Sequence, residues 1–192
     1  MPKKIGILAL QGDFAKHQEM LWLLKIETIL VKKPGDLHGC EGLIIPGGET
    51  TTLTKLIQKY NLYEPIREFA EEHPIMGTCA GAIMVASTVD DHRIEPLQLI
   101  DISVTRNAYG RQIDSFITQV EVTFLQGPTR FKTVFIRAPK ISNVGSQVEV
   151  LMELRGNPIM VQESNVLALT FHPELTTDPR IHQYFLEHFF TI

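Results

Sequence analysis

The sequence predicts an α/β fold in which a single domain, residues 1–192, holds a mixed, mostly parallel sheet flanked by helices and extended by antiparallel strands. In the first half of the chain, short apolar segments alternate with helical patterns, which is typical of a parallel sheet covered on both faces. In the second half, apolar segments follow one another with turn residues between them, which predicts strands joined by hairpins. A chain of 192 residues is long enough to bury one sizeable core.

The first half of the chain supplies the alternation of strands and helices. Apolar, β-prone segments predict strands at 4–10, 27–31, 42–45 and 75–78. The helical spacing of apolar residues predicts helices at 14–25, 51–59, 63–72 and 80–87. Asp13 is placed to cap the first of these helices, and Pro46 ends the third strand.

The second half supplies the antiparallel extension. Turn signals such as QGP, NVG and RGNP separate apolar segments at 120–124, 133–138, 148–154, 159–163 and 166–171. We expect these segments to extend the sheet and to build its antiparallel edge. The last helix is expected over 178–190, with Asp178 as its cap and Pro179 in the first helical position.

Composition and charge exclude several classes of protein. The 18 Lys and Arg against 22 Asp and Glu give a net charge of −4, which lacks the basic excess of a nucleic-acid binder. The apolar runs are far shorter than the roughly 20 residues of a membrane-spanning helix, and the run after Lys4 lacks the cleavage site of a signal peptide. Two cysteines, Cys40 and Cys79, are typical of a reducing compartment. We therefore expect a cytoplasmic protein with no nucleic-acid or membrane partner.

The segment GTCAG at 77–81 lies between a predicted strand and a predicted helix and has the form of a nucleophile elbow, G-x-[S/C]-x-G. Such a turn strains the backbone of the nucleophile and brings neighbouring chain close, so the flanking glycines leave the room it needs. The N-terminus of the following helix favours the thiolate of Cys79, which is the species that attacks. The alternative is a small buried hydrophobe, and this is our interpretation of Cys40.

The segment HPE at 172–174 can supply a base. Residues i and i+2 of an extended chain point to the same side, so the imidazole of His172 and the carboxylate of Glu174 can converge on one site. HQE at 17–19 has the same spacing, but it lies in a predicted helix, where such residues do not face each other. The alternative for His172 is a strand-end histidine with no special role.

The segment PGGE at 46–49 can aim backbone N–H groups into the same site as an oxyanion hole, with the amide of Ala80 as a second donor. Taken alone, this segment is more often an ordinary glycine-rich turn. Three such segments follow strands, and open α/β sheets bind ligands at the carboxyl ends of their strands. Their joint occurrence favours a site.

Through PGGE, GTCAG and HPE the chain resembles the class I, triad-type glutamine amidotransferases, which implies a flavodoxin-like fold. Within that class it is similar to the glutaminase subunits of pyridoxal 5'-phosphate synthase, the PdxT/SNO family. The closer similarity is carried by LQGD at 10–13, GGETTT from Gly47, RNAYGRQIDSF at 106–116, FIRAP at 135–139 and FHPELT at 171–176. These blocks run from the first predicted strand to the last, so the resemblance covers essentially the whole chain.

The resemblance implies a role for each matching residue. Cys79 would be the nucleophile, His172 the general base and then acid, and Glu174 the group that orients His172. The residues implied to line the glutamine pocket are Gly47, Gly48, Glu49, Arg106, Ile136 and Arg137. Gln11 matches a family residue that responds to the synthase partner. The chain departs from the family pattern at Thr50, where Ser is expected, and at Ala82, where Leu is common.

The implied reaction is hydrolysis of L-glutamine to L-glutamate and ammonia through a thioester on Cys79, with the oxyanion held by backbone N–H groups near Gly48 and Ala80. The ammonia would be channelled to a partner synthase subunit, in a hetero-oligomer that makes pyridoxal 5'-phosphate. We expect weak activity without the partner, with the Gly47–Gly48 peptide as the switch.

No metal and no bound cofactor are expected, because the sequence has no metal-ligand cluster, phosphate-binding loop or dinucleotide fingerprint. The alternatives are a glutaminase subunit of another class I amidotransferase, a γ-glutamyl peptidase of similar fold, and a catalytically silent regulatory subunit.

Overall fold

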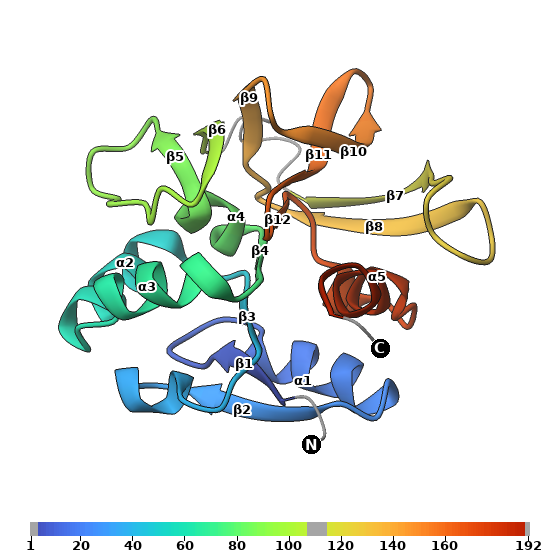
Figure 1. The fold of residues 1–192 in the computed structure, drawn as a ribbon. Coiled ribbons are helices and arrows are strands. Elements are labelled where there is room, and N and C mark those ends of the chain that lie inside the picture. The colour runs from blue at the N-terminus through green and yellow to red at the C-terminus, as the bar shows by residue number, and fades with distance from the viewer. Residues whose placement is uncertain (1–3, 107–114, 191–192) are drawn as a thin grey trace.

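The computed structural model describes residues 4–106 and 115–190 (Figure 1). Its largest sheet has seven strands, in the order β10 (Glu149–Leu154), β11 (Asn157–Glu163), β12 (Val166–Leu169), β4 (Ile75–Thr78), β3 (Gly42–Ile45), β1 (Lys4–Leu8) and β2 (Glu27–Val31). The five strands from β12 to β2 pair in parallel, whereas β11 pairs antiparallel with both β12 and β10. The predicted mixed, mostly parallel sheet with an antiparallel extension is confirmed.

Helices cover both faces of this sheet (Figure 1). One face carries α2 (Thr50–Lys59), α3 (Tyr63–Glu72) and α4 (Ala80–Val85), and the other carries α1 (Phe14–Leu23) and α5 (Arg180–Phe189). In β3, Leu43 and Ile45 pack in the core below the first group and Ile44 in the core below the second, which is the two-residue period of a strand. We infer a single domain, because both cores pack on the same sheet. No helix among the described residues is long and apolar enough to span a membrane.

Two smaller sheets lie beside the main one, and they correct the sequence prediction. The segments expected at 120–124 and 133–138 do not extend the main sheet, because β7 (Ser115–Glu121) and β8 (Arg130–Ile136) pair with each other as a separate ribbon. A three-stranded sheet of β5 (Ala86–Val89), β6 (Ile100–Thr105) and β9 (Lys140–Val144) was not expected at all. The helix expected over 80–87 ends at Val85. The strand β5 follows it directly and contains the β-branched residues Thr88 and Val89, which suit a strand.

Several element ends also differ from the prediction. The first strand ends at Leu8, and α1 ends at Leu23 because Lys25 adopts a φ of 60° outside the helical region. Asp13 occupies the N-cap position of α1, but its side chain makes no capping hydrogen bond. α5 begins at Arg180 and not at 178, although Asp178 Oδ1 still accepts the N–H of Arg180 at 3.1 Å.

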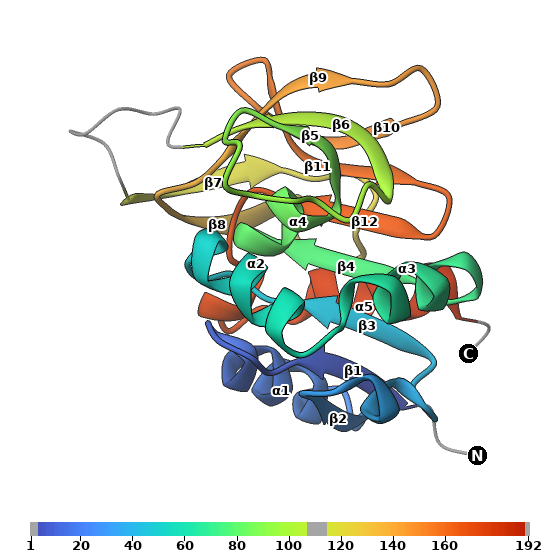
Figure 2. The same ribbon diagram turned by 90° about the vertical axis from the view of Figure 1, so that its left-hand side faces the viewer.

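The parallel pairing brings several strand ends to one edge of the sheet. Ile45 of β3 is in register with Gly77 of β4, and Leu169 of β12 is in register with Thr78. Figure 2 shows the arrowheads of β3 and β4 pointing the same way. The segments that follow these strands therefore meet at the carboxyl edge, which is where open α/β sheets bind ligands.

Close packing at this edge depends on Gly81. A Cβ built on Gly81 would lie 1.9 Å from the carbonyl oxygen of Ile45, which is backbone that cannot move aside as a side chain would. A Cβ on Gly35 would meet nothing within 4 Å.

We therefore expect Gly81→Ala to lower the free energy of unfolding by about 2 kcal/mol or more, the range of an overpacked core, and the melting temperature by several degrees. Gly35→Ala is the matched control and is expected to melt within about 1 °C of the parent, as surface substitutions do. Thermal unfolding followed by circular dichroism measures both, and equal melting temperatures for the two variants would contradict the packing argument.

Candidate active site

Cys79 lies at a strained turn between β4 and α4. Its φ is 49° and its ψ is −104°, a conformation that L residues adopt at a cost, and its N–H donates to the carbonyl of Leu169 at 2.8 Å. A Cβ on Gly77 would lie 2.5 Å from the carbonyl oxygen of Gly81, so the two flanking glycines are in close contact. The strand, turn and helix expected around GTCAG are all present.

His172 and Glu174 follow β12 at the same edge. The N–H of His172 donates to the carbonyl of Val134 at 2.8 Å, and its Nδ1 lies 2.7 Å from Glu174 Oε1. Burial alone would lower the pKa of His172, but hydrogen bonds with Cys79 and Glu174 outweigh burial and raise that pKa. The imidazole is thus held between the thiol and the carboxylate and binds a proton readily.

The PGGE segment packs against this group. A Cβ on Gly47 would lie 2.4 Å from Cε1 of His172 and 3.2 Å from Cβ of Cys79, so only glycine fits at this position. The N–H of Gly47 donates to Thr78 Oγ1 at 3.1 Å, and its carbonyl accepts the N–H of Asp13 at 3.2 Å. The next peptide N–H, that of Gly48, points away from Asp13, because N–H and C=O are opposed in a trans peptide and the described chain has no cis bond.

A cavity of about 210 Å³ opens above these groups. It is lined by Asp13, Gly48, Glu49, Thr50, Cys79, Ile83, Arg106, Ile136, Arg137 and His172. Every pocket residue expected from the sequence except Gly47 lines it, and Gly47 lies beneath it against His172. The sulfur of Cys79 lies 3.8 Å from the carbonyl oxygen of Ile136.

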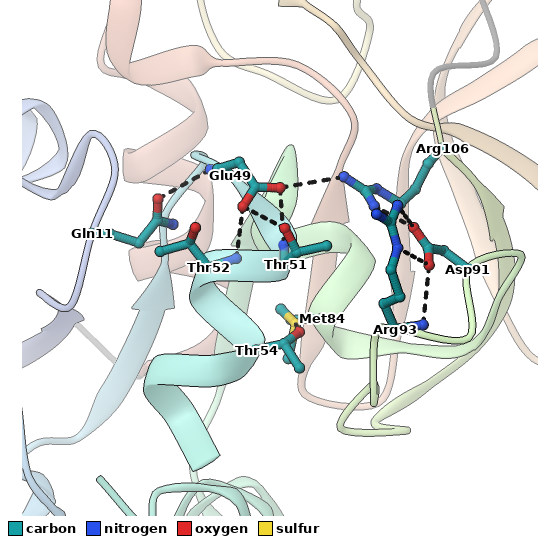
Figure 3. Close-up of polar contacts among 9 residues, drawn as sticks. All are labelled: Gln11, Glu49, Thr51, Thr52, Thr54, Met84, Asp91, Arg93 and Arg106. Carbon is teal, nitrogen blue, oxygen red and sulfur yellow. Dashed lines mark hydrogen bonds and ion pairs between the residues drawn. The ribbon is translucent and has the colours of Figure 1, made fainter. Parts of the chain in front are cut away.

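Charged side chains hold one side of this cavity together (Figure 3). Arg106 pairs with Asp91, and its Nη2 lies 3.5 Å from Glu49 Oε1. Partial burial would raise the pKa of Glu49, but hydrogen bonds from Thr51 and Thr52 lower it to about 2. Glu49 is therefore an anion at neutral pH, placed beside a fixed guanidinium.

Gln11, from the loop after β1, closes the other side. Its Oε1 accepts the N–H of Glu49 at 3.0 Å, and its buried Nε2 has no hydrogen-bond partner among the described residues. A Cβ on Gly48 would lie 2.4 Å from that Nε2, so the amide of Gln11 occupies the space that a side chain at this position would fill.

Sequence reasoning missed several residues of this site. Asp13 was assigned only a capping role, yet its Oδ2 lies 3.8 Å from His172 Nδ1. Asp91 and Ile83 lie in no recognisable motif, so the sequence does not predict their place beside the cavity. Thr78 directly precedes Cys79, but the sequence does not predict the hydrogen bond to its hydroxyl. Within the block expected at 106–116, residues 107–114 lie outside the described residues.

One group of candidate metal ligands occurs among residues 4–106 and 115–190. It is formed by Asp13, His172 and Glu174, whose ligand atoms lie within 4.8 Å of one another. Nδ1 of His172 is already committed to Glu174 at 2.7 Å, so the ring nitrogen of this group is not free to bind an ion. We interpret His172 and Glu174 as a hydrogen-bonded acid–base pair, with the carboxylate of Asp13 nearby at 3.8 Å.

Comparison with known proteins gives one family and one fold. Residues 7–191 match the SNO glutamine amidotransferase family. The subunit PdxT of pyridoxal 5'-phosphate synthase from Dictyoglomus turgidum is 48% identical over 186 residues, covering 96% of this chain and 97% of the relative. The PdxT subunit from Thermotoga petrophila is 46% identical over 185 residues, covering 96% and 98%.

Solved structures agree with this. A crystal structure described as a glutamine amidotransferase superposes with a TM-score of 0.89 at 45% identity, covering 95% of this chain and 97% of that one. A protein described as a putative GMP synthase subunit from Thermoplasma acidophilum superposes with a TM-score of 0.69 at 19% identity, covering 97% and 94%, and shares the fold.

The two cysteines are expected to differ sharply in reactivity. Burial raises the pKa of Cys40 to about 11, so at pH 8 only about a thousandth of this thiol is the reactive thiolate. Cys79 lines the cavity beside His172. Iodoacetamide at pH 8 is therefore expected to label Cys79 in the native protein and to leave Cys40 intact, as read by mass spectrometry of peptides.

Unfolding in guanidinium is the control, and both thiols should then react. Faster labelling of Cys40 than of Cys79 in the native protein would contradict the assignment.

Proposed function

This chain belongs to the SNO glutamine amidotransferase family, and on that basis we propose that it is the glutaminase subunit of a pyridoxal 5'-phosphate synthase. The observation that carries the proposal is the group formed by Cys79, His172 and Glu174 at the carboxyl edge of the sheet. It offers a nucleophile, a base and an orienting carboxylate in the order that acyl transfer needs.

In the proposed reaction, the thiolate of Cys79 attacks the side-chain amide carbon of L-glutamine and forms a tetrahedral intermediate. Backbone N–H groups of Gly48 and Ala80 stabilise its oxyanion. The C–N bond then breaks as protonated His172 gives its proton to the leaving nitrogen, which departs as ammonia. Water, deprotonated by His172, hydrolyses the γ-glutamyl thioester to L-glutamate and restores the thiol.

The cavity suits a substrate that carries both an α-ammonium and an α-carboxylate group. Glu49, kept ionised by Thr51 and Thr52, can bind the α-ammonium group. Arg106 can bind the α-carboxylate, because its 3.5 Å contact with Glu49 is long and leaves donor capacity on that side. Arg137 and Ile136 close the cavity from the ribbon that contains β8.

Replacing Cys79 tests the reaction directly. We expect Cys79→Ala to lower kcat for glutamine hydrolysis by about 10⁴-fold or more, because members of a catalytic triad act as a unit. Ammonia and glutamate release from L-glutamine, assayed with the synthase subunit present, measures this loss. Cys40→Ala is the matched control and should keep activity; near-parental activity of Cys79→Ala would refute the proposed function.

The partner is proposed to act through Gln11. This side chain accepts the N–H of Glu49 and packs over Gly48, so a partner that draws the amide outward to bind its buried Nε2 would act on the Gly47–Gly48 peptide. Ammonia released in the cavity would then pass to the synthase subunit. Both described cysteines are free thiols, which supports a cytoplasmic location.

Adding the synthase subunit is expected to raise glutaminase activity at least tenfold, a coupling of about 1.4 kcal/mol or more. Gln11→Glu keeps the oxygen that accepts from Glu49 but removes the N–H donor, so it should lose most of this activation. Gln147→Glu changes an exposed turn residue in the same way and serves as the control. Full activity of the isolated chain, unchanged by the partner, would argue against gating.

A further inference from the structure

A chain of buried side chains continues behind the proposed active site. His17 on α1 and His182 on α5 are both 0% exposed, and Nδ1 of His17 lies 2.9 Å from Nε2 of His182. On its other side, Nε2 of His17 lies 3.1 Å from Thr78 Oγ1 and 3.5 Å from Glu174 Oε2. The proposed reaction assigns nothing to either histidine.

Both imidazoles are neutral. Burial, with smaller contributions from His182 and His172, places the pKa of His17 well below its ordinary value. Burial lowers the pKa of His182 to about 3. Each ring therefore carries a single N–H, and the direction of the hydrogen bond between them fixes where both protons lie.

One direction satisfies the surroundings better. If His182 donates from Nε2, then His17 accepts at Nδ1 and presents its own N–H from Nε2 to Thr78 and toward the outer oxygen of Glu174. That oxygen, Oε2, is buried and has no hydrogen-bond donor among the described residues, so the N–H of His17 at 3.5 Å would be the nearest to it. The opposite direction would aim a nitrogen lone pair at the carboxylate and leave Nδ1–H of His182 buried without an acceptor, which folded proteins avoid.

His17 thereby touches both halves of the proposed machinery. Thr78 Oγ1 accepts the N–H of Gly47 at 3.1 Å, which fixes the Pro46–Gly47 peptide, the one before the Gly47–Gly48 peptide that carries the proposed oxyanion donor. Glu174 Oε1 holds Nδ1 of His172 at 2.7 Å. A single ring on α1 therefore lies beside the hydroxyl that fixes the peptide preceding the oxyanion donor and beside the carboxylate that orients the base.

We propose that His17 is a positioning residue for glutamine hydrolysis, acting through its Nε2–H on Thr78 and Glu174, with His182 holding it in the required tautomer. This inference rests on the proposed function, because it assigns His17 to the same reaction. It predicts that the loss of the Nε2–H lowers kcat while KM changes little, since neither histidine lines the substrate cavity.

A matched pair of substitutions separates this role from packing. An Asn amide reaches about as far as Nδ1 of histidine and a Gln amide about as far as Nε2, so H17N keeps the contact with His182 and H17Q keeps the N–H toward Thr78. We expect H17N to lower kcat by about 10- to 100-fold with KM within about threefold, as displaced catalytic groups do. H17Q is expected to restore most of this loss.

A second pair at Thr78 keeps the test decisive if H17N does not fold. Val has nearly the volume of Thr but no hydroxyl, whereas Ser keeps the hydroxyl and loses a methyl group. The proposal expects T78S to retain a higher kcat than T78V. A purely packing role predicts the reverse order, because the smaller Ser leaves a cavity.

The experiment measures kcat and KM for glutamine with the synthase subunit present, and C79A is the reference for the reaction itself. Lower kcat in H17N and T78V than in H17Q and T78S, at similar KM, supports the proposal. Equal kcat for H17N and H17Q and for T78V and T78S, or a higher kcat for T78V than for T78S, overturns the positioning role of His17. If C79A is inactive in the same assay, the proposed function still stands. An active C79A overturns both.

Discussion

The parallel pairing of β3, β4 and β12 is the constraint on which the rest of the structure depends. In-register pairs such as Ile45 with Gly77 make the strands end within a residue or two of one another. A shift of one residue would turn each strand over and move Cys79 away from His172. The contacts of Gly81 with Ile45 show how little space this register leaves between neighbouring backbones.

Local patterns in the sequence predicted most of this sheet, since strands such as 42–45 and 75–78 are short apolar runs with clear breaks. They did not predict which strands pair. The segments at 120–124 and 133–138 look like further strands of the main sheet, but their partners are each other. Pairing of this kind depends on contacts between distant segments, and the alternation within one strand carries no information about them.

The same distinction holds for the site. That Cys79, His172 and Glu174 lie together was predictable, because each belongs to a local motif that follows a strand. His17 was not, because its spacing to Glu19 on a helix correctly excluded that pair and pointed to no other. Its actual neighbours, Thr78 and His182, lie 61 and 165 residues away, a separation that only the folded chain brings together.

The position of β12 has a consequence for how the chain folds. This strand separates β11 from β4 in the sheet, yet it follows every other described strand in the sequence. Until residues 166–169 have been made, β4 has an open edge of unpaired backbone N–H and C=O groups, and pairing of this long range is slow to form. The nascent chain therefore lacks His172 and Glu174 beside its thiol, and a half-made subunit has no complete group for the proposed hydrolysis of glutamine.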